Sequence, residues 1–282
     1  MKMLRTYFKE FIRVIGKIKI SMLAAQISFF LLLAFFPFCI LLLLLLGQIN
    51  IDNTIFFNTI NSFLPEQIAP MFTDIIKNAS EHMNIFWSLA GILTTIWVST
   101  RAAHAMIVAV NSLYEKEDRW AWTRRMGLAV ILTFALMIFI VISILFVLFG
   151  REVLNTFLIY TGRTPDSLSG IWGILRAVLA LLGITIFFTV LYTISTKSKI
   201  RIKEALPGAV FSAILWFLLT HVFSFIITNF FIFSSIYGSL GGIILMMMWL
   251  FWGSHVILLG VAINKTNQNL RESRIQKVDI TS

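Results

Sequence analysis

Ionisable and amide side chains stand inside long apolar stretches of this chain, where such groups are costly and usually functional. Arg101 and His104 lie one turn apart on a predicted helix, and Asn111 falls on the same face, within roughly 80° at 100° per residue. Because a guanidinium group suits phosphate and carboxylate, this face predicts a polar cavity that binds an anionic group. The alternative is that Arg101 lies near the end of its apolar stretch and extends to water.

Polar side chains also recur at helical spacing in other apolar stretches. One stripe begins at Thr185 and Thr189 and continues at Tyr192. Hydrogen bonds between helices explain this stripe as well as a transport pathway does. The residues predicted to line a candidate substrate cavity are Gln26, Arg101, His104, Asn111, Thr185, Thr189, Tyr192, His221, Ser224, Thr228, Tyr237 and His255. The residues predicted to act as hinges or in close helix packing are Pro37, Pro207, Gly238, Gly241 and Gly242.

No pattern for catalysis is recognisable in the sequence. The chain has no HExxH motif, no phosphate-binding glycine loop and no pair of acids inside an apolar stretch. Its one cysteine, Cys39, excludes an intramolecular disulfide and a cysteine-clustered metal site. We therefore expect a protein that is not an enzyme and that has no cofactor or bound metal.

The composition places these polar residues in a membrane. Hydrophobic residues make up 59% of the chain and charged residues 13%, whereas soluble domains are about a quarter charged. The apolar residues form blocks of about 20 or more, the length at which a helix crosses a hydrocarbon core of about 30 Å. We therefore expect an all-α, polytopic membrane protein of six transmembrane helices rather than a barrel of short alternating strands.

The predicted organisation is a single membrane domain over residues 1–282. Residues 2–19 form an amphipathic helix in the membrane interface, with its basic side toward anionic headgroups. Residues 48–83, between the first and second spans, form one or two short amphipathic helices. The six spans are 22–47, 85–112, 126–149, 171–195, 207–233 and 240–263, with an outer loop over 150–170 and a cytoplasmic tail over 264–282. Pro37 predicts a kink in the first span, and Pro207 suits the first turn of the fifth.

The distribution of basic residues predicts the orientation. Of the 23 Lys and Arg residues, 18 lie in the N-terminal segment, in two alternate loops and in the C-terminal tail. Because cytoplasmic loops are rich in Lys and Arg, we expect both termini in the cytoplasm and an even number of spans. Anionic lipids then explain the net charge of +10, whereas nucleic acid would need a soluble basic surface.

Four short stretches, which are specific as a set, carry a resemblance to a known family. They are residues 24–30 with Pro37, Asn111 with the charged loop after it, Pro207-Gly208-Ala209, and residues 237–242 continuing to Gly260 and Asn264. In these residues the chain resembles the YihY/virulence factor BrkB family of bacterial inner-membrane proteins, some of which were once labelled ribonuclease BN. The resemblance implies a six-helix membrane fold and a role in the cell envelope. The sequence offers neither a metal-binding cluster nor an RNA-binding surface for a ribonuclease.

Two functions are open from the sequence. The first is a transporter or flippase-like protein for a lipid or another amphiphilic or anionic molecule, since polar residues occur on several spans. The second is a non-transporting scaffold that organises envelope enzymes through residues 48–83 and the outer loops. Either would be a multi-pass protein of the bacterial inner membrane that contacts lipids, including anionic headgroups. A homo-oligomer is compatible with both functions, and no nucleic-acid partner is expected.

Overall fold

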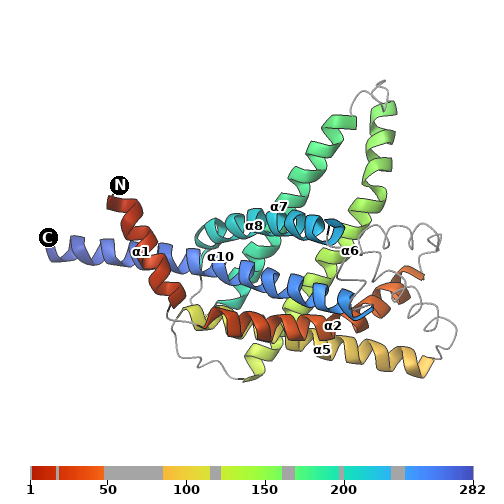
Figure 1. Ribbon diagram of the computed structural model, residues 1–282, viewed down its shortest axis with the longest axis horizontal. Coiled ribbons are helices and arrows are strands. Elements are labelled where there is room, and N and C mark those ends of the chain that lie inside the picture. The colour runs from red at the N-terminus through yellow and green to blue at the C-terminus, as the bar shows by residue number, and fades with distance from the viewer. Residues whose placement is uncertain are drawn as a thin grey trace.

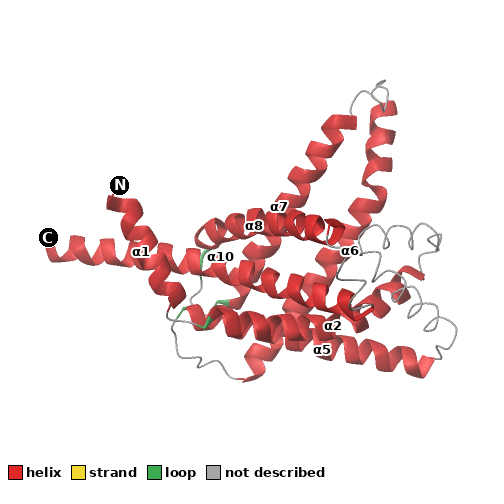
Figure 2. Cartoon of the chain, viewed as in Figure 1, coloured by secondary structure: helices red, strands yellow, loops and turns green. Residues whose placement is uncertain are grey.

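The computed structural model describes residues 2–16, 19–47, 85–114, 122–160, 169–196, 200–229 and 239–281. The helices in these residues are α1 (Lys2–Gly16), α2 (Ile20–Gly47), α5 (Ile85–Leu113), α6 (Trp122–Tyr160), α7 (Ser169–Ser195), α8 (Ile202–Asn229) and α10 (Ser239–Thr281) (Figure 1). This described part of the chain contains no strand (Figure 2), which confirms the expected all-α fold. The short amphipathic helices predicted within 48–83 lie outside the described residues.

In the described part of the chain, five helices are long and apolar enough to cross a membrane. Their apolar stretches are Leu93–Leu113 in α5, Thr123–Ser143 in α6, Ala177–Ser195 in α7, Ile202–Ile226 in α8 and Gly241–Ser273 in α10. A sixth span is present when α1 and α2, which are bent by 60° relative to each other, are counted as one. The described residues therefore form a polytopic helical membrane protein, and the predicted six spans are reached when this bent pair is included.

The six long helices form a closed ring. α2 packs against α5, α5 against α6, α6 against α7, α7 against α8, α8 against α10, and α10 against α2. α5 also contacts α7 and α10. Of the most apolar part of α5, 56% is buried inside the protein, whereas the corresponding value for α6 is 11%. Because α5 faces protein more than lipid, it needs fewer apolar side chains, and its mean hydropathy of 1.3 is the lowest of the five.

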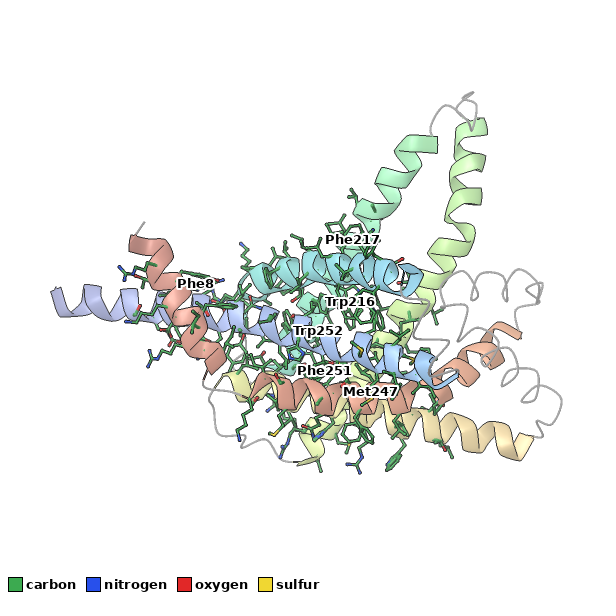
Figure 3. The ribbon with its side chains drawn as sticks, viewed as in Figure 1. Phe8, Trp216, Phe217, Met247, Phe251 and Trp252 are labelled. Atoms are coloured by element: carbon green, nitrogen blue, oxygen red, sulfur yellow. The ribbon has the colours of Figure 1, made fainter. Side chains whose placement is uncertain are left out.

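The outer surface of the ring is apolar, as contact with lipid requires. On α6, Ile131, Phe134, Ile138 and Ile142 are exposed at intervals of three and four residues. On α8, Phe217 lies on the outer side, whereas Trp216 lies between α8 and α10 (Figure 3). Continuous rows of exposed apolar side chains on a soluble protein would be aggregation sites, so these rows indicate that the surface faces hydrocarbon.

Two helices continue through segments that the sequence predicted to be irregular. α6 extends to Tyr160, into the predicted outer loop 150–170, because the single Gly150 costs a helix only about 1 kcal/mol. α10 extends to Thr281, through the predicted tail 264–282, whose described residues contain no Gly or Pro. Pro37 lies inside α2, and the second half of that helix turns away from the first in Figure 1, as a proline predicts.

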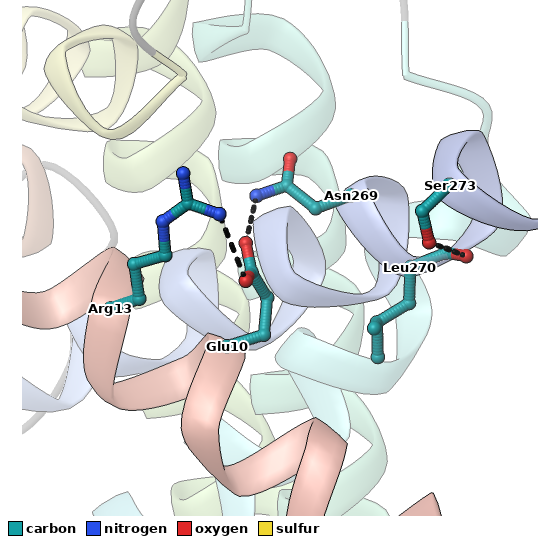
Figure 4. Close-up of polar contacts among 5 residues, drawn as sticks. All are labelled: Glu10, Arg13, Asn269, Leu270 and Ser273. Carbon is teal, nitrogen blue, oxygen red and sulfur yellow. Dashed lines mark hydrogen bonds and ion pairs between the residues drawn. The ribbon is translucent and has the colours of Figure 1, made fainter. Parts of the chain in front are cut away.

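The end of α10 is held by α1. Asn269 Nδ2 donates to Glu10 Oε1 at 2.8 Å, and Arg13 Nη1 lies 3.4 Å from the other oxygen of Glu10 (Figure 4). On the same helix Val14 is buried, whereas Phe8 and Ile12 are 63% and 53% exposed. α1 therefore packs one apolar side against the protein and exposes apolar side chains on another.

Glycines bring the backbones of α8 and α10 into contact. A Cβ added at Gly208 would overlap the carbonyl oxygen of Gly260 and the side chain of Asn264. A Cβ added at Gly260 would overlap Ser212 Oγ and Tyr192 Oη. No residue larger than glycine fits this crossing without a shift of helix backbone, so the two glycines set the distance between the helices.

Side-chain hydrogen bonds join three helices around these glycines. Tyr192 of α7 donates to the Ile257 carbonyl of α10 at 2.9 Å and lies 2.7 Å from Ser212 Oγ of α8. Ser212 in turn lies 3.1 Å from the carbonyl of Val256. Since lipid offers no partner for such groups, each of these bonds resists separation of the helices. We call Tyr192, Gly208, Ser212, Gly260 and Asn264 the three-helix junction.

Asn264 forms hydrogen bonds with the backbone of α8 on both sides of Pro207. This helix begins at Ile202, five residues before the predicted start at Pro207, so the proline lies inside it. Pro207 has no N–H to donate to the carbonyl four residues earlier. Asn264 supplies hydrogen bonds at the same place: its Oδ1 accepts from the Gly208 N–H at 2.8 Å, and its Nδ2 donates to the Ala205 carbonyl at 3.0 Å.

We predict that Gly260→Ala lowers the thermal stability of the purified protein in detergent, because its methyl group has no space between Ser212 and Tyr192. Overpacking of this kind costs about 1–3 kcal/mol. The control is Gly127→Ala on α6, where a Cβ meets nothing within 4 Å and alanine favours the helix. Thermal unfolding monitored by tryptophan fluorescence measures both. Equal melting temperatures for the two variants would contradict the packing described for Gly260.

Candidate functional site

The predicted anion-binding face of α5 runs from the outer surface into the bundle. Arg101 is exposed, and its guanidinium carbon lies 5.3 Å from the ring centroid of Trp97, which is 60% exposed. His104 is half-buried and Asn111 is buried. These three side chains therefore have different surroundings, and none of them lines either of the two cavities described below.

Asn111 caps the end of α7. Its Nδ2 donates to the carbonyl of Ser195, the last residue of that helix, at 2.7 Å, and to the Ile107 carbonyl at 2.9 Å. The last carbonyls of a helix have no partner within it, so this buried amide satisfies one of them from a neighbouring helix.

Tyr114, which follows the end of α5, is also buried. Burial raises the pKa of its phenol above the ordinary value, and Lys265 Nζ lies 5.6 Å from its ring centroid.

The polar stripe of α7 divides into local and interhelical contacts. Thr185 donates to the Leu181 carbonyl at 2.7 Å, and Thr189 donates to the Thr185 carbonyl at 2.8 Å. Both hydroxyls are therefore bound to their own helix. Tyr192 alone among these three bonds to other helices, in the three-helix junction. The stripe thus contains helix–helix hydrogen bonding, one of its two predicted explanations.

The remaining predicted cavity residues are not gathered at one place. His221 is exposed on α8, with Nδ1 2.8 Å from the Phe217 carbonyl, and Ser224 is also exposed. His255 of α10 is half-buried, with Nε2 3.4 Å from Ser21 Oγ, and Gln26 is exposed on α2.

Three other predicted residues fall outside what the structure describes. They are Tyr237, Gly238 and the side chain of Thr228. The remaining packing glycines, Gly241 and Gly242, are buried at the start of α10.

The structure contains an apolar cavity that the polar residues did not predict. Its volume is about 140 Å³, and it lies between α2, α5, α6 and α10. Small residues widen it, Ala34 from α2 and Ala102 and Ala103 from α5, opposite Met137 of α6. The wall is almost entirely apolar, since Thr133, which lines it, donates its hydroxyl to the Ala129 carbonyl at 2.8 Å. The sequence could not have predicted this cavity, because the residues that line it are of the types found in any apolar span.

A second, polar pocket of about 200 Å³ lies where α8 begins. Lys203 and Glu204 of α8 and Arg271 of α10 line it, together with amide side chains of α10. Arg271 Nη1 lies 2.6 Å from Glu204 Oε1. The sequence placed these charges in a loop and a tail, and only the packing of α8 against α10 brings them together. In the part of the chain that the structure describes, no cluster of His, Cys, Asp and Glu could hold a metal ion.

Comparison with known proteins identifies relatives along nearly the whole chain. The family model "Virulence factor BrkB" matches residues 11–279. The "Putative ribonuclease-like protein YfkH" of Bacillus subtilis is 28% identical over 241 residues, which cover 86% of this chain and 87% of that protein. A UPF0761 membrane protein of Aeromonas salmonicida is 24% identical over 244 residues, 86% of this chain and 82% of the relative. No solved structure matches the chain.

A further UPF0761 membrane protein, from Pseudoalteromonas translucida, is 27% identical over 203 residues, 71% of this chain and 66% of that protein. These relatives are bacterial, and most carry names that state only a membrane location. The family match confirms the resemblance found in the sequence motifs and agrees with the apolar helices of the structure. The chain belongs to the virulence factor BrkB family and is a multi-pass membrane protein.

Proposed function

We propose that this chain is a transporter or flippase-like protein for a lipid-like amphiphile, whose apolar tail enters the cavity between α2, α5, α6 and α10. The observation that carries the proposal is the cavity itself, about 140 Å³ of space with apolar walls inside the membrane-spanning helices. The space is partly open at the lipid-facing side of α6, so in a membrane an apolar group could enter it from the bilayer.

The size and chemistry of the cavity suit an acyl chain. A dry apolar cavity of about 150 Å³ in a soluble protein binds benzene, so this one accommodates several methylene groups. Water would find almost no hydrogen-bonding partner there. Phe134, which lines the cavity, is also 46% exposed on the lipid-facing side of α6. The tail of a membrane lipid therefore has a lateral way in.

Arg101 does not line this cavity, and its proposed role is to bind an anionic headgroup at the outer surface of α5. It is exposed on α5, and no carboxylate of the described residues forms an ion pair with it. Trp97 beside it is the kind of aromatic residue found at the level of lipid headgroups. Among the described residues the partner of Arg101 is this ring, and an anionic headgroup would add an ionic partner.

Orientation and the absence of catalysis are parts of the same proposal. With both termini in the cytoplasm, the three-helix junction and the polar pocket lie at the inner side of the membrane. The ribonuclease-like name belongs to the relative from Bacillus subtilis, and we propose that this chain does not cleave RNA. The alternative function as a scaffold depends on residues 48–83, which lie outside the described residues.

We predict that Ala103→Phe slows lipid movement about tenfold, the effect of losing about 1.4 kcal/mol of binding, because the ring fills the cavity. The purified chain is reconstituted in liposomes with a fluorescent phosphatidylcholine, and dithionite quenching measures its movement between leaflets. Met137→Trp fills the same cavity from α6 and should act likewise.

The matched control for this experiment is Ala180→Phe, which adds the same ring to an exposed position of α7. It should move lipid like the original chain. All variants are first compared by thermal unfolding, so that a folding defect is recognised. Unchanged lipid movement in a folded Ala103→Phe variant would sink the role of the cavity, and no movement by the original chain would sink transport of this lipid class.

We predict that Arg101→Gln slows an anionic lipid, phosphatidylglycerol, about fivefold and leaves phosphatidylcholine unchanged. The loss corresponds to about 1 kcal/mol for one partly exposed charge pair. Arg101→Lys keeps the charge and should retain most of the rate for phosphatidylglycerol. Equal effects of Arg101→Gln on both lipids, or none on either, would contradict a role for this side chain in headgroup binding.

A further inference from the structure

The polar pocket at the start of α8 has a built lining of charged and amide groups. Lys203, Glu204 and Pro207 come from the first two turns of α8, and Asn267, Gln268 and Arg271 come from one face of α10. Asn264, which bonds to Gly208 and Ala205, lines the same pocket and fixes the two helices on either side of it. The volume of about 200 Å³ is therefore held open by the three-helix junction rather than by surface side chains alone.

Positive charge exceeds negative charge in this lining. Glu204 is the only acid among the lining residues, and both of its oxygens are engaged. Oε1 lies 2.6 Å from Arg271 Nη1, and Oε2 accepts the Arg201 N–H at 3.2 Å. Lys203 has no ion pair in the described part of the chain. Arg271 carries five N–H donors, of which this contact with Glu204 uses one nitrogen.

Several hydrogen-bonding groups of the pocket are unused. The amide of Asn267 forms no hydrogen bond with the described residues. Gln268 Nε2 donates to Glu272 Oε1 at 3.0 Å, but its buried Oε1 has no partner. At the start of α8 the N–H groups of Glu204 and Ala205 donate to the Arg201 carbonyl, whereas those of Ile202 and Lys203 have no acceptor within the helix. Lys203, Arg271 and the amide of Asn267 are therefore available to a ligand, whereas Gln268 Oε1 is an acceptor and does not favour an anion.

The groups that are unused are chiefly donors and cations, which points to an anion. An ammonium, a guanidinium and a helix N-terminus together match the charge and the several acceptor oxygens of phosphate. The pocket also lies at one end of the apolar stretch of α8, which begins at Ile202. A phosphate there has two sources, the headgroup of a phospholipid and free inorganic phosphate.

We infer that this pocket is a phosphate-binding site, in which Lys203 and Arg271 bind the anion and Asn267 donates a hydrogen bond to it. The anion competes with Glu204 for Arg271, so Glu204 weakens binding and makes it reversible. The site is separate from the apolar cavity and does not depend on transport. A bound anion would contact both α8 and α10, and would therefore stabilise the same helix pair that Asn264 joins by hydrogen bonds.

Binding is tested on the full chain in uncharged detergent micelles by isothermal titration calorimetry. The probes are inorganic phosphate and dihexanoyl phosphatidylglycerol. The double variant Lys203→Gln with Arg271→Gln should bind at least about tenfold more weakly than the original chain. Glu204→Gln should bind several-fold more tightly, a gain that a merely structural role of these residues would not produce.

The matched control is Arg13→Gln on α1. Arg13 has the same 65% side-chain exposure as Arg271 and also pairs with a glutamate, but it lies outside the pocket. It should leave binding unchanged. Binding of the lipid alone supports a membrane phosphate, binding of inorganic phosphate alone supports a free one, and binding of both supports either source. The inference is overturned if neither probe binds, if the double variant binds normally, or if Arg13→Gln weakens binding equally.

Discussion

The contact between Gly208 of α8 and Gly260 of α10 is the constraint on which the rest of this structure depends. Without side chains at these two positions the helix backbones meet, and only then can Tyr192 reach both Ser212 and the Ile257 carbonyl. Asn264 bonds to the Ala205 carbonyl and the Gly208 N–H beside Pro207, which offers no N–H of its own. In a bilayer no solvent replaces such bonds, so close packing and polar pairing act together.

This junction leaves the two halves of the bundle differently packed. Along α10 it spans residues 256–264, whereas the apolar cavity touches Leu250, about 9 Å nearer the start of the helix at 1.5 Å per residue. Asn111 ties α5 to the end of α7 at the same side as the junction. Hydrogen bonds thus join the helices at the junction, whereas the middle of the bundle contains the apolar cavity. In the proposed function, the tail of the amphiphile would occupy this middle part and not the hydrogen-bonded end.

The sequence predicted the positions of the helices better than the contacts between them. Blocks of apolar residues were sufficient for an all-α membrane fold, because crossing a bilayer allows little else. Tyr192 was predicted as a polar residue with two explanations, and its bonds to α8 and α10 support one of them. Gly208, Gly260 and Asn264 entered the sequence argument only through the family resemblance, since spacing alone does not reveal which glycines meet. Helical periodicity placed Arg101 on one face of α5 with His104 but could not tell which face lies outward.

The most direct test of the central claim is a cryo-electron microscopy structure of the chain in lipid nanodiscs. If the cavity holds the tail of an amphiphile, elongated density will lie between α2, α5 and α6, in contact with Ala103 and Met137, and will leave the bundle beside Phe134. A bundle whose helices close on one another with no space at Ala103, or an open cavity that contains no density while lipid is resolved around the protein, would contradict it.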